Sequence, residues 1–127
     1  MELLVEFGEL ANETKCFKFW STKESKREKV LEEYIDCLFM ILYFCNVLDI
    51  SLDEEFPLID KKDIIETFLN LYNLGIKLNH NLNKDNIKKL LVELINLSDI
   101  LNFTKEDLEC ETNRKSLIIE KRLNSNY

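Results

Sequence analysis

Two pairs of acidic residues have types and spacing that suit chemistry at a metal ion. Glu6 and Glu9 lie three positions apart near the start of the chain, and Glu33 and Asp36 repeat that spacing. Residues three apart are neighbours on a helix surface, so each pair would present its carboxylates together. Four carboxylates on two facing helices form a site for hard divalent cations. Mg²⁺ suits such a site because it prefers oxygen ligands and keeps positions open for water and phosphate oxygens.

The second pair has the more informative surroundings. Glu33 and Asp36 share or border a helix face with four uncharged residues: Val30, Cys37, Met40 and Phe44. A lone carboxylate on an apolar face must take up a proton or find a partner. No basic side chain is evident between the four acids, which favours a cation as that partner. A solvated acidic face is the alternative, because the chain has 24 acids and pairs three apart also arise by chance.

Helical periodicity predicts the elements that carry these acids. Apolar residues recur at about 100° per residue along the first segment, and Glu6, Glu9 and Glu13 lie on the flank of that stripe. The segment around Pro57 is a predicted connecting loop, because proline fits poorly inside a helix. The predicted helices cover approximately residues 1–17, 24–48, 61–78, 83–102 and 104–122.

Capping residues support these helix boundaries. Ser21 or Thr22 could cap the second helix and Asn83 the fourth, while Thr104 and Asp107 resemble a capping box that opens the fifth. Four or five helices joined by short links predict an all-α fold, a four- to five-helix bundle. At 127 residues the chain has the length of a single domain.

The composition agrees with a helical bundle and argues against some partners. Hydrophobic residues make up 46% of the chain, and two Gly and one Pro leave little material for the turns of an all-β fold. The net charge of −7 argues against nonspecific nucleic-acid binding, which draws its affinity from Lys and Arg. A small anionic ligand carried in by metal ions is compatible with that charge.

The cysteines and one apolar run bear on location and assembly. The four cysteines form no C-x-x-C pair and no signal peptide is evident, so we expect buried free thiols in the cytoplasm. The run Cys37–Cys45 lacks charge but is too short to span a bilayer, so no membrane association is expected. We predict that this run is buried on all sides and that a homodimer covers it.

The amino-acid sequence of the first third of the chain resembles that of a known family. The stretches "EFGELANETKCFKFWS" and "VLEEYIDCLFM" are similar to "ELGELANE…FKYWS" and "LLEEYVDGLHF" of the dimeric, all-α dUTPases, which belong to the MazG-type nucleoside triphosphate pyrophosphatase superfamily. The resemblance covers roughly Leu3 to Leu42. The metal motif of that superfamily, E-x-x-E, a spacer and E-x-x-D, falls on the four acids that helical spacing also selects: Glu6, Glu9, Glu33 and Asp36.

The resemblance implies an activity and roles for several residues. It implies hydrolysis of dUTP to dUMP and diphosphate, with Mg²⁺ ions held by the four acids. Glu9 is the expected catalytic carboxylate, which would orient or deprotonate the attacking water. Lys18 is expected near phosphate or acid. Phe17 and Trp20 would offer a flat wall to the base, with ordinary packing at a helix end as the alternative.

Three departures from the family pattern concern the start of the chain, the base pocket and the tail. The family has a further helix ahead of the first motif, and with only five residues before Glu6 we expect that helix to be missing here. Phe39 stands where the family has His, and Met40 replaces a Phe that stacks on the base, which Met covers loosely. In the tail, Lys115 and Arg122 match phosphate-binding cations of the family, but three polar residues are replaced.

Two functions of different classes are therefore predicted. The first is a Mg²⁺-dependent nucleotide pyrophosphatase that favours dUTP with weakened selectivity, since lost base-reading groups affect selectivity more than chemistry. The second is a truncated, catalytically weak or inactive relative that serves as a binding or regulatory subunit. The complete set of four acids favours the first function, while the missing helix and the altered tail favour the second.

Overall fold

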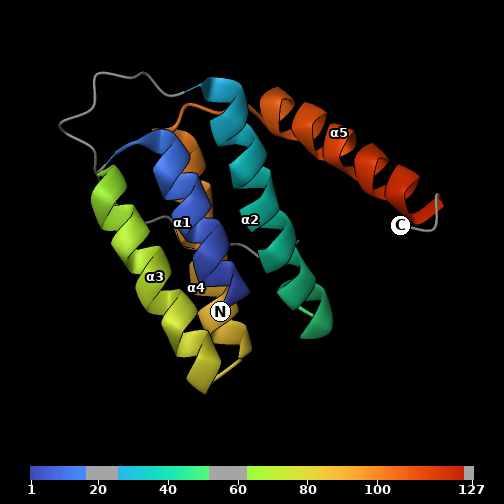
Figure 1. The fold of residues 1–127 in the computed structure, drawn as a ribbon. Coiled ribbons are helices and arrows are strands. Elements are labelled where there is room, and N and C mark those ends of the chain that lie inside the picture. Colours follow the sequence, from blue (N-terminus) through green and yellow to red (C-terminus); the bar gives the residue numbers. More distant parts are fainter. Residues whose placement is uncertain (17–25, 52–62, 125–127) are drawn as a thin grey trace.

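The computed structural model describes residues 1–16, 26–51 and 63–124, apart from the side chains at positions 79, 122 and 123. Within these ranges the chain forms helices only, which confirms the predicted all-α bundle. The helices, labelled in Figure 1, are α1 (Glu2–Thr14), α2 (Arg27–Val47), α3 (Ile64–His80), α4 (Lys84–Ile100) and α5 (Lys105–Asn124).

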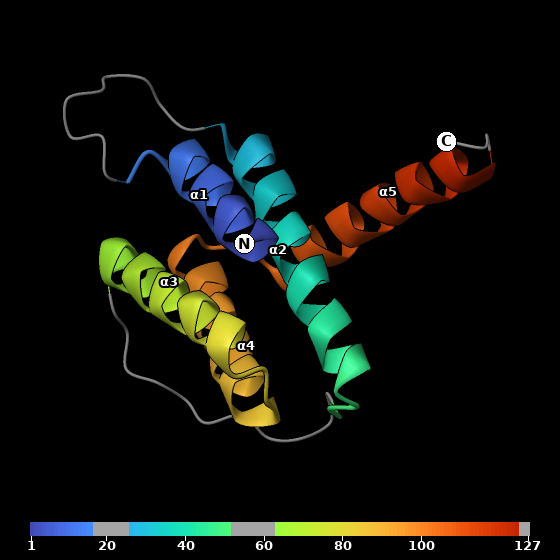
Figure 2. The same ribbon diagram turned by 60° about the horizontal axis from the view of Figure 1, so that its bottom comes forward.

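Four of the helices form the body of the molecule and the fifth leaves it. α1 packs against α2 and α3, and α4 also packs against α2 and α3, so these four helices enclose a common core. Among the described residues, α5 contacts α2 and no other helix. Figure 2 shows α5 projecting away from the four-helix body. The last helix is therefore attached through α2 alone.

The core lies where the apolar stripes of α1 to α4 meet. Tyr34 is almost completely buried, and its hydroxyl donates a hydrogen bond to the carbonyl oxygen of Leu94 at 2.7 Å. Burial of one large apolar side chain contributes roughly 1.5–3 kcal/mol. The fully buried apolar residues come from all four helices of the body, and they include Phe7, Leu10, Ile35, Ile41, Leu71, Ile87, Leu90, Leu94 and Leu97.

Two of the predicted caps are present as hydrogen bonds. The Asn83 side chain accepts from the backbone N–H of Asn86 at 2.9 Å, so Asn83 caps α4. At the start of α5, the Asp107 N–H donates to the Thr104 hydroxyl and the Thr104 N–H donates to the Asp107 carboxylate. This reciprocal pair is the predicted capping box with an aspartate in place of glutamate.

The first three helices differ from their predicted bounds. α1 ends at Thr14 rather than near position 17, because Lys15 adopts a left-handed conformation with φ of 55° and its N–H bonds back to the carbonyl of Ala11. Ser21 and Thr22, the predicted caps of the second helix, lie outside the described residues. α2 begins at Arg27 instead of near position 24. α3 begins at Ile64, after its N-cap Asp63, rather than near position 61.

The sequence predicts that the apolar run in α2 is buried on all sides, and this prediction is wrong because one face of the run is open to solvent. Cys37, Ile41 and Cys45 are buried in the core, whereas the Tyr43 side chain is 64% exposed. Cys110 on α5 is exposed and Cys16 is half-buried, so the expectation of buried thiols is confirmed for Cys37 and Cys45 only. No described helix is long and apolar enough to cross a membrane.

Arg27 fastens the start of α5 to the start of α2. Its guanidinium donates hydrogen bonds to the carbonyls of Leu101 and Asn102, at 3.1 and 2.7 Å, and to the Asp107 carboxylate at 3.0 Å. The same group lies 4.8 Å from the ring centroid of Phe103, within the range of a cation–π contact. These contacts set the direction in which α5 leaves the body.

Candidate metal centre

Three of the four predicted metal ligands meet between α1 and α2. Glu6 and Glu9 come from α1 and Glu33 comes from α2, and each offers a carboxylate oxygen within 4.8 Å of the others. The buried faces of both helices hold the backbones in place, so the approach of these charges follows from core packing. We call Glu6, Glu9 and Glu33 the acidic triad.

Two oxygens of the acidic triad are buried without a hydrogen-bond partner. They are Oε2 of Glu6 and Oε2 of Glu33, whereas Glu9 is exposed to solvent. A buried polar atom with no partner costs roughly 1–3 kcal/mol, and more when it carries charge. Oxygen-only ligands with unpaired lone pairs fit a hard divalent cation such as Mg²⁺.

Two members of the acidic triad, Glu6 and Glu33, have raised pKa values in the absence of a cation. Burial, followed by the charges of Glu9, Asp36 and Glu6, raises the pKa of Glu33 from its ordinary 4.5 to about 7. Burial and then the charge of Glu9 likewise raise the pKa of Glu6. A divalent cation would remove this repulsion, so the electrostatics of the site favour cation uptake.

Asp36, the fourth predicted ligand, has a different partner in the structure. Its Oδ1 accepts a hydrogen bond from Nζ of Lys115 on α5 at 2.8 Å, and the same ammonium lies 3.5 Å from Oε1 of Glu32. The expectation that no basic side chain lies between the acids is therefore wrong for Asp36. Asp36 is nevertheless close enough for its charge to raise the pKa of Glu6 and Glu33.

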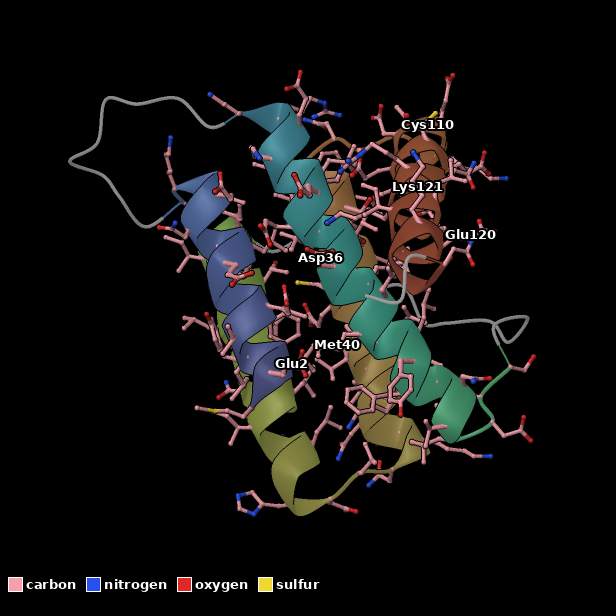
Figure 3. The ribbon with its side chains drawn as sticks, turned by 45° about the vertical axis from the view of Figure 1, so that its right-hand side comes forward. Glu2, Asp36, Met40, Cys110, Glu120 and Lys121 are labelled. Atoms are coloured by element: carbon pink, nitrogen blue, oxygen red, sulfur yellow. The ribbon has the colours of Figure 1, made fainter. Side chains whose placement is uncertain are left out.

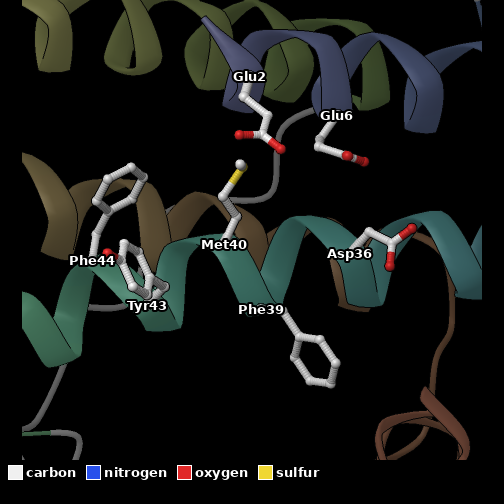
Figure 4. Close-up of a pocket in the computed structure, with 7 residues that line it drawn as sticks. All are labelled: Glu2, Glu6, Asp36, Phe39, Met40, Tyr43 and Phe44. Carbon is white, nitrogen blue, oxygen red and sulfur yellow. The ribbon is translucent and has the colours of Figure 1, made fainter. Parts of the chain in front are cut away.

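A pocket of about 510 Å³ opens beside the acids. Figure 3 shows Glu2 on α1 near Met40 on α2, while α5 lies on the other side of α2. In the close-up of Figure 4, the carboxylate of Glu2 faces the thioether of Met40, the carboxylate of Glu6 is directed toward the side of Asp36, and Phe39 points away from them. The lining residues are Glu2, Glu6, Asp36, Phe39, Met40, Tyr43 and Phe44.

Sequence reasoning missed two features of this pocket. Glu2 is four positions before Glu6 and therefore on the same helix face, a spacing that could have identified it. Tyr43 follows Met40 by three positions, but its exposure is not evident from a run without charges. The pocket thus combines an acidic end with an aromatic and thioether end.

Several predicted substrate-binding residues cannot be placed against this pocket. Phe17, Lys18 and Trp20 lie outside the described residues, as does the side chain of Arg122. Met40 lines the pocket, and Lys115 lies beside Asp36.

Fold and site together define an all-α protein with a carboxylate cluster next to an open pocket. A family model for dUTPase matches residues 1–127, the whole chain, and the protein belongs to that family of all-α dUTPase-like nucleotide pyrophosphatases. The search of curated proteins and the search of solved structures found no match.

Proposed function

We propose that the protein hydrolyses dUTP to dUMP and diphosphate in a Mg²⁺-dependent reaction. One observation carries the proposal: the acidic triad holds buried, unpartnered carboxylate oxygens beside a pocket of about 510 Å³. The match of a dUTPase family model to the whole chain supports dUTP as the substrate. Glu6, Glu9, Glu33 and Asp36 are the proposed metal ligands.

Each acid has a role that its surroundings support. The unpartnered oxygens of Glu6 and Glu33 would hold the cation, and Asp36 would complete the set from the next turn of α2. Bound Mg²⁺ would neutralise the phosphate chain and lower the pKa of a coordinated water. Glu9 is the solvent-exposed member of the triad, and we assign it the role of orienting or deprotonating the attacking water.

The pocket supports a place for the base and sugar. Met40, Tyr43 and Phe44 provide a soft, apolar wall, and Met adapts to different faces more readily than a rigid ring does. Such a wall covers a base without reading its hydrogen-bonding edge, so we expect weak selectivity among pyrimidine nucleotides. Phe17, Lys18, Trp20, Lys115 and Arg122 remain the proposed contacts to base and phosphates.

The experiment is a diphosphate-release assay on the full chain with dUTP, dTTP and dCTP. Turnover is expected with Mg²⁺, and EDTA should abolish it. Glu9→Gln should lower the rate by about 10²–10⁴-fold, as loss of a general base does. Glu120→Gln, which alters an exposed acid on α5, should leave the rate unchanged. If no nucleotide is turned over with Mg²⁺, the enzyme proposal is wrong, and nucleotide binding without turnover would indicate a regulatory subunit.

We also propose that the protein is a cytoplasmic homodimer. The exposed apolar face of α2, which includes Tyr43 and Val47 at 64% and 55% exposure, supports a second copy as its cover. Free thiols at all four cysteines are compatible with a reducing compartment. Light scattering at micromolar concentration should give twice the chain mass, and a monomer at that concentration would contradict the dimer.

A further inference from the structure

The ammonium of Lys115 joins α5 to a proposed metal ligand. Its Nζ lies 2.8 Å from Oδ1 of Asp36 and 3.5 Å from Oε1 of Glu32, and its side chain is only 14% exposed. We propose that Lys115 is a positioning residue that binds Asp36 in the metal-free protein, and that a divalent cation replaces Lys115 as the partner of Asp36. Loading of the metal centre then loosens α5 from α2. This inference rests on the proposed function.

The geometry sets Asp36 apart from the acidic triad. One oxygen from each of Glu6, Glu9 and Glu33 lies within 4.8 Å of the others, and Asp36 is not part of that group. Its carboxylate instead bonds to Lys115. To become a fourth ligand, Asp36 must turn toward the triad and away from the ammonium. A divalent cation also repels the nearby ammonium, so the two cations compete for one carboxylate.

Because α5 is attached through α2 alone in the described part of the chain, loss of the ion pair between Lys115 and Asp36 would loosen α5 from the body of the protein. Among the described residues α2 is the one helix that α5 contacts. Polar contacts between the two include the Arg27–Asp107 ion pair near the start of α5 and the contacts of Lys115 further along, and Leu108, near the start, also packs against the core. When Asp36 leaves, Lys115 keeps only the longer contact to Glu32, at 3.5 Å. The base of α5 stays fastened by Arg27, while its remaining length loses its shorter ion pair to α2. The freed ammonium is then available to the phosphate chain of a nucleotide.

The first experiment measures amide hydrogen exchange of the full wild-type chain at pH 8, with and without saturating Mn²⁺ or Mg²⁺. Metal binding itself is followed by calorimetry with the metal alone. We expect exchange in residues 108–120 to become about three- to tenfold faster on loading, the range for losing one partly exposed, charge-assisted pair. Exchange in α4 should not become faster, because α4 makes no contact with α5 among the described residues.

The second experiment compares three variants of α5. Lys115→Met should bind Mn²⁺ about three- to tenfold more tightly and should show fast α5 exchange even without metal. Lys115→Arg keeps the charge and should restore slow exchange in the metal-free protein. Lys121→Met, the matched control, removes an exposed charge from the same helix (Figure 3) and should behave like the wild type in both measurements.

The outcomes separate this inference from the proposed function. If wild-type protein binds the metal but amide hydrogen exchange in α5 is unchanged or slower, Asp36 does not leave Lys115 for the metal. The inference is then refuted and the proposed metal centre stands. If Lys115→Met binds metal no more tightly than Lys121→Met, the competition is likewise refuted. If the wild type binds neither metal, with nucleotide or without it, both the inference and the proposed function fail.

Discussion

Glu33→Gln should stabilise the metal-free protein although it removes a proposed metal ligand. Glutamine keeps the shape of the side chain and removes its negative charge. In the wild type, that charge is disfavoured by burial and by the negative charges of Glu9, Asp36 and Glu6. The free energy of unfolding at pH 8 in EDTA should therefore be higher for the variant than for the wild type. Such a gain would show that the Glu33 carboxylate is buried without a compensating charge, the deficit that a bound cation would remove.

The pH dependence follows from the raised pKa of Glu33. Its ordinary value is 4.5 and its value in the folded chain is about 7, so folding strengthens the hold on this proton. The stabilisation from this group is complete below about pH 4.5 and is lost as the pH rises through 7. The difference between variant and wild type should therefore be small at pH 4.5 and full at pH 8.

The magnitude is limited by solvent near the site. A pKa that moves from 4.5 to about 7 corresponds to a ceiling of about 3 kcal/mol. Glu33 is partly exposed, and solvent screening reduces the effect to about 1–2 kcal/mol. For a chain of this size, that gain raises the melting temperature by about 3–8 °C.

The assay is thermal unfolding at pH 4.5 and pH 8, in EDTA and in Mg²⁺, with Glu120→Gln as the control. In saturating Mg²⁺ the order should reverse, because ligand binding to the folded state stabilises the wild type and the variant lacks a ligand. A variant that is no more stable than the wild type at pH 8 in EDTA would refute the account of buried repulsion. The acids would then form a solvated face.

Three further substitutions test the fold around the site. Phe7→Ala removes a fully buried ring that packs against Tyr72 of α3 and should destabilise the protein by about 3–5 kcal/mol in urea unfolding, without changing the exposed face of α1. Tyr34→Phe deletes the hydroxyl that donates to the Leu94 carbonyl and should cost about 1–2 kcal/mol in the same measurement. Arg27→Met should release the base of α5 and lower its protection from hydrogen exchange, and the α3–α4 pair should keep its own protection.

Local chemistry explains why most of the helix boundaries could be predicted. Asn83 and the Thr104–Asp107 pair act within one turn of the chain, so a sequence pattern contains the whole interaction. The early end of α1 could not be predicted, because a left-handed Lys15 replaces the Gly or Asn usual at that position. Without Gly or Asn at that position, the sequence does not indicate where the helix ends.

The open face of α2 shows a different limit. Residues Cys37–Cys45 contain no charge, and composition alone cannot say which of them lie against the core. Tyr43 is exposed because α1 and α4 cover other faces of α2 and α5 diverges from it (Figure 2). Burial of an apolar run depends on the arrangement of its neighbours, which is a property of the tertiary structure.

The contact between Lys115 and Asp36 joins residues 79 positions apart, and no periodicity connects them. It also bears on what the acidic triad needs. The ammonium reaches the edge of the cluster, at Asp36 and Glu32, while Oε2 of Glu6 and Oε2 of Glu33 stay buried and unpartnered. Lys29 also pairs with Glu32, at 3.6 Å, so the positive charges lessen the repulsion at Asp36 and Glu32 and leave Glu6, Glu9 and Glu33 short of positive charge. That remaining deficit, rather than the number of acids in the chain, is the physical reason to expect a divalent cation there.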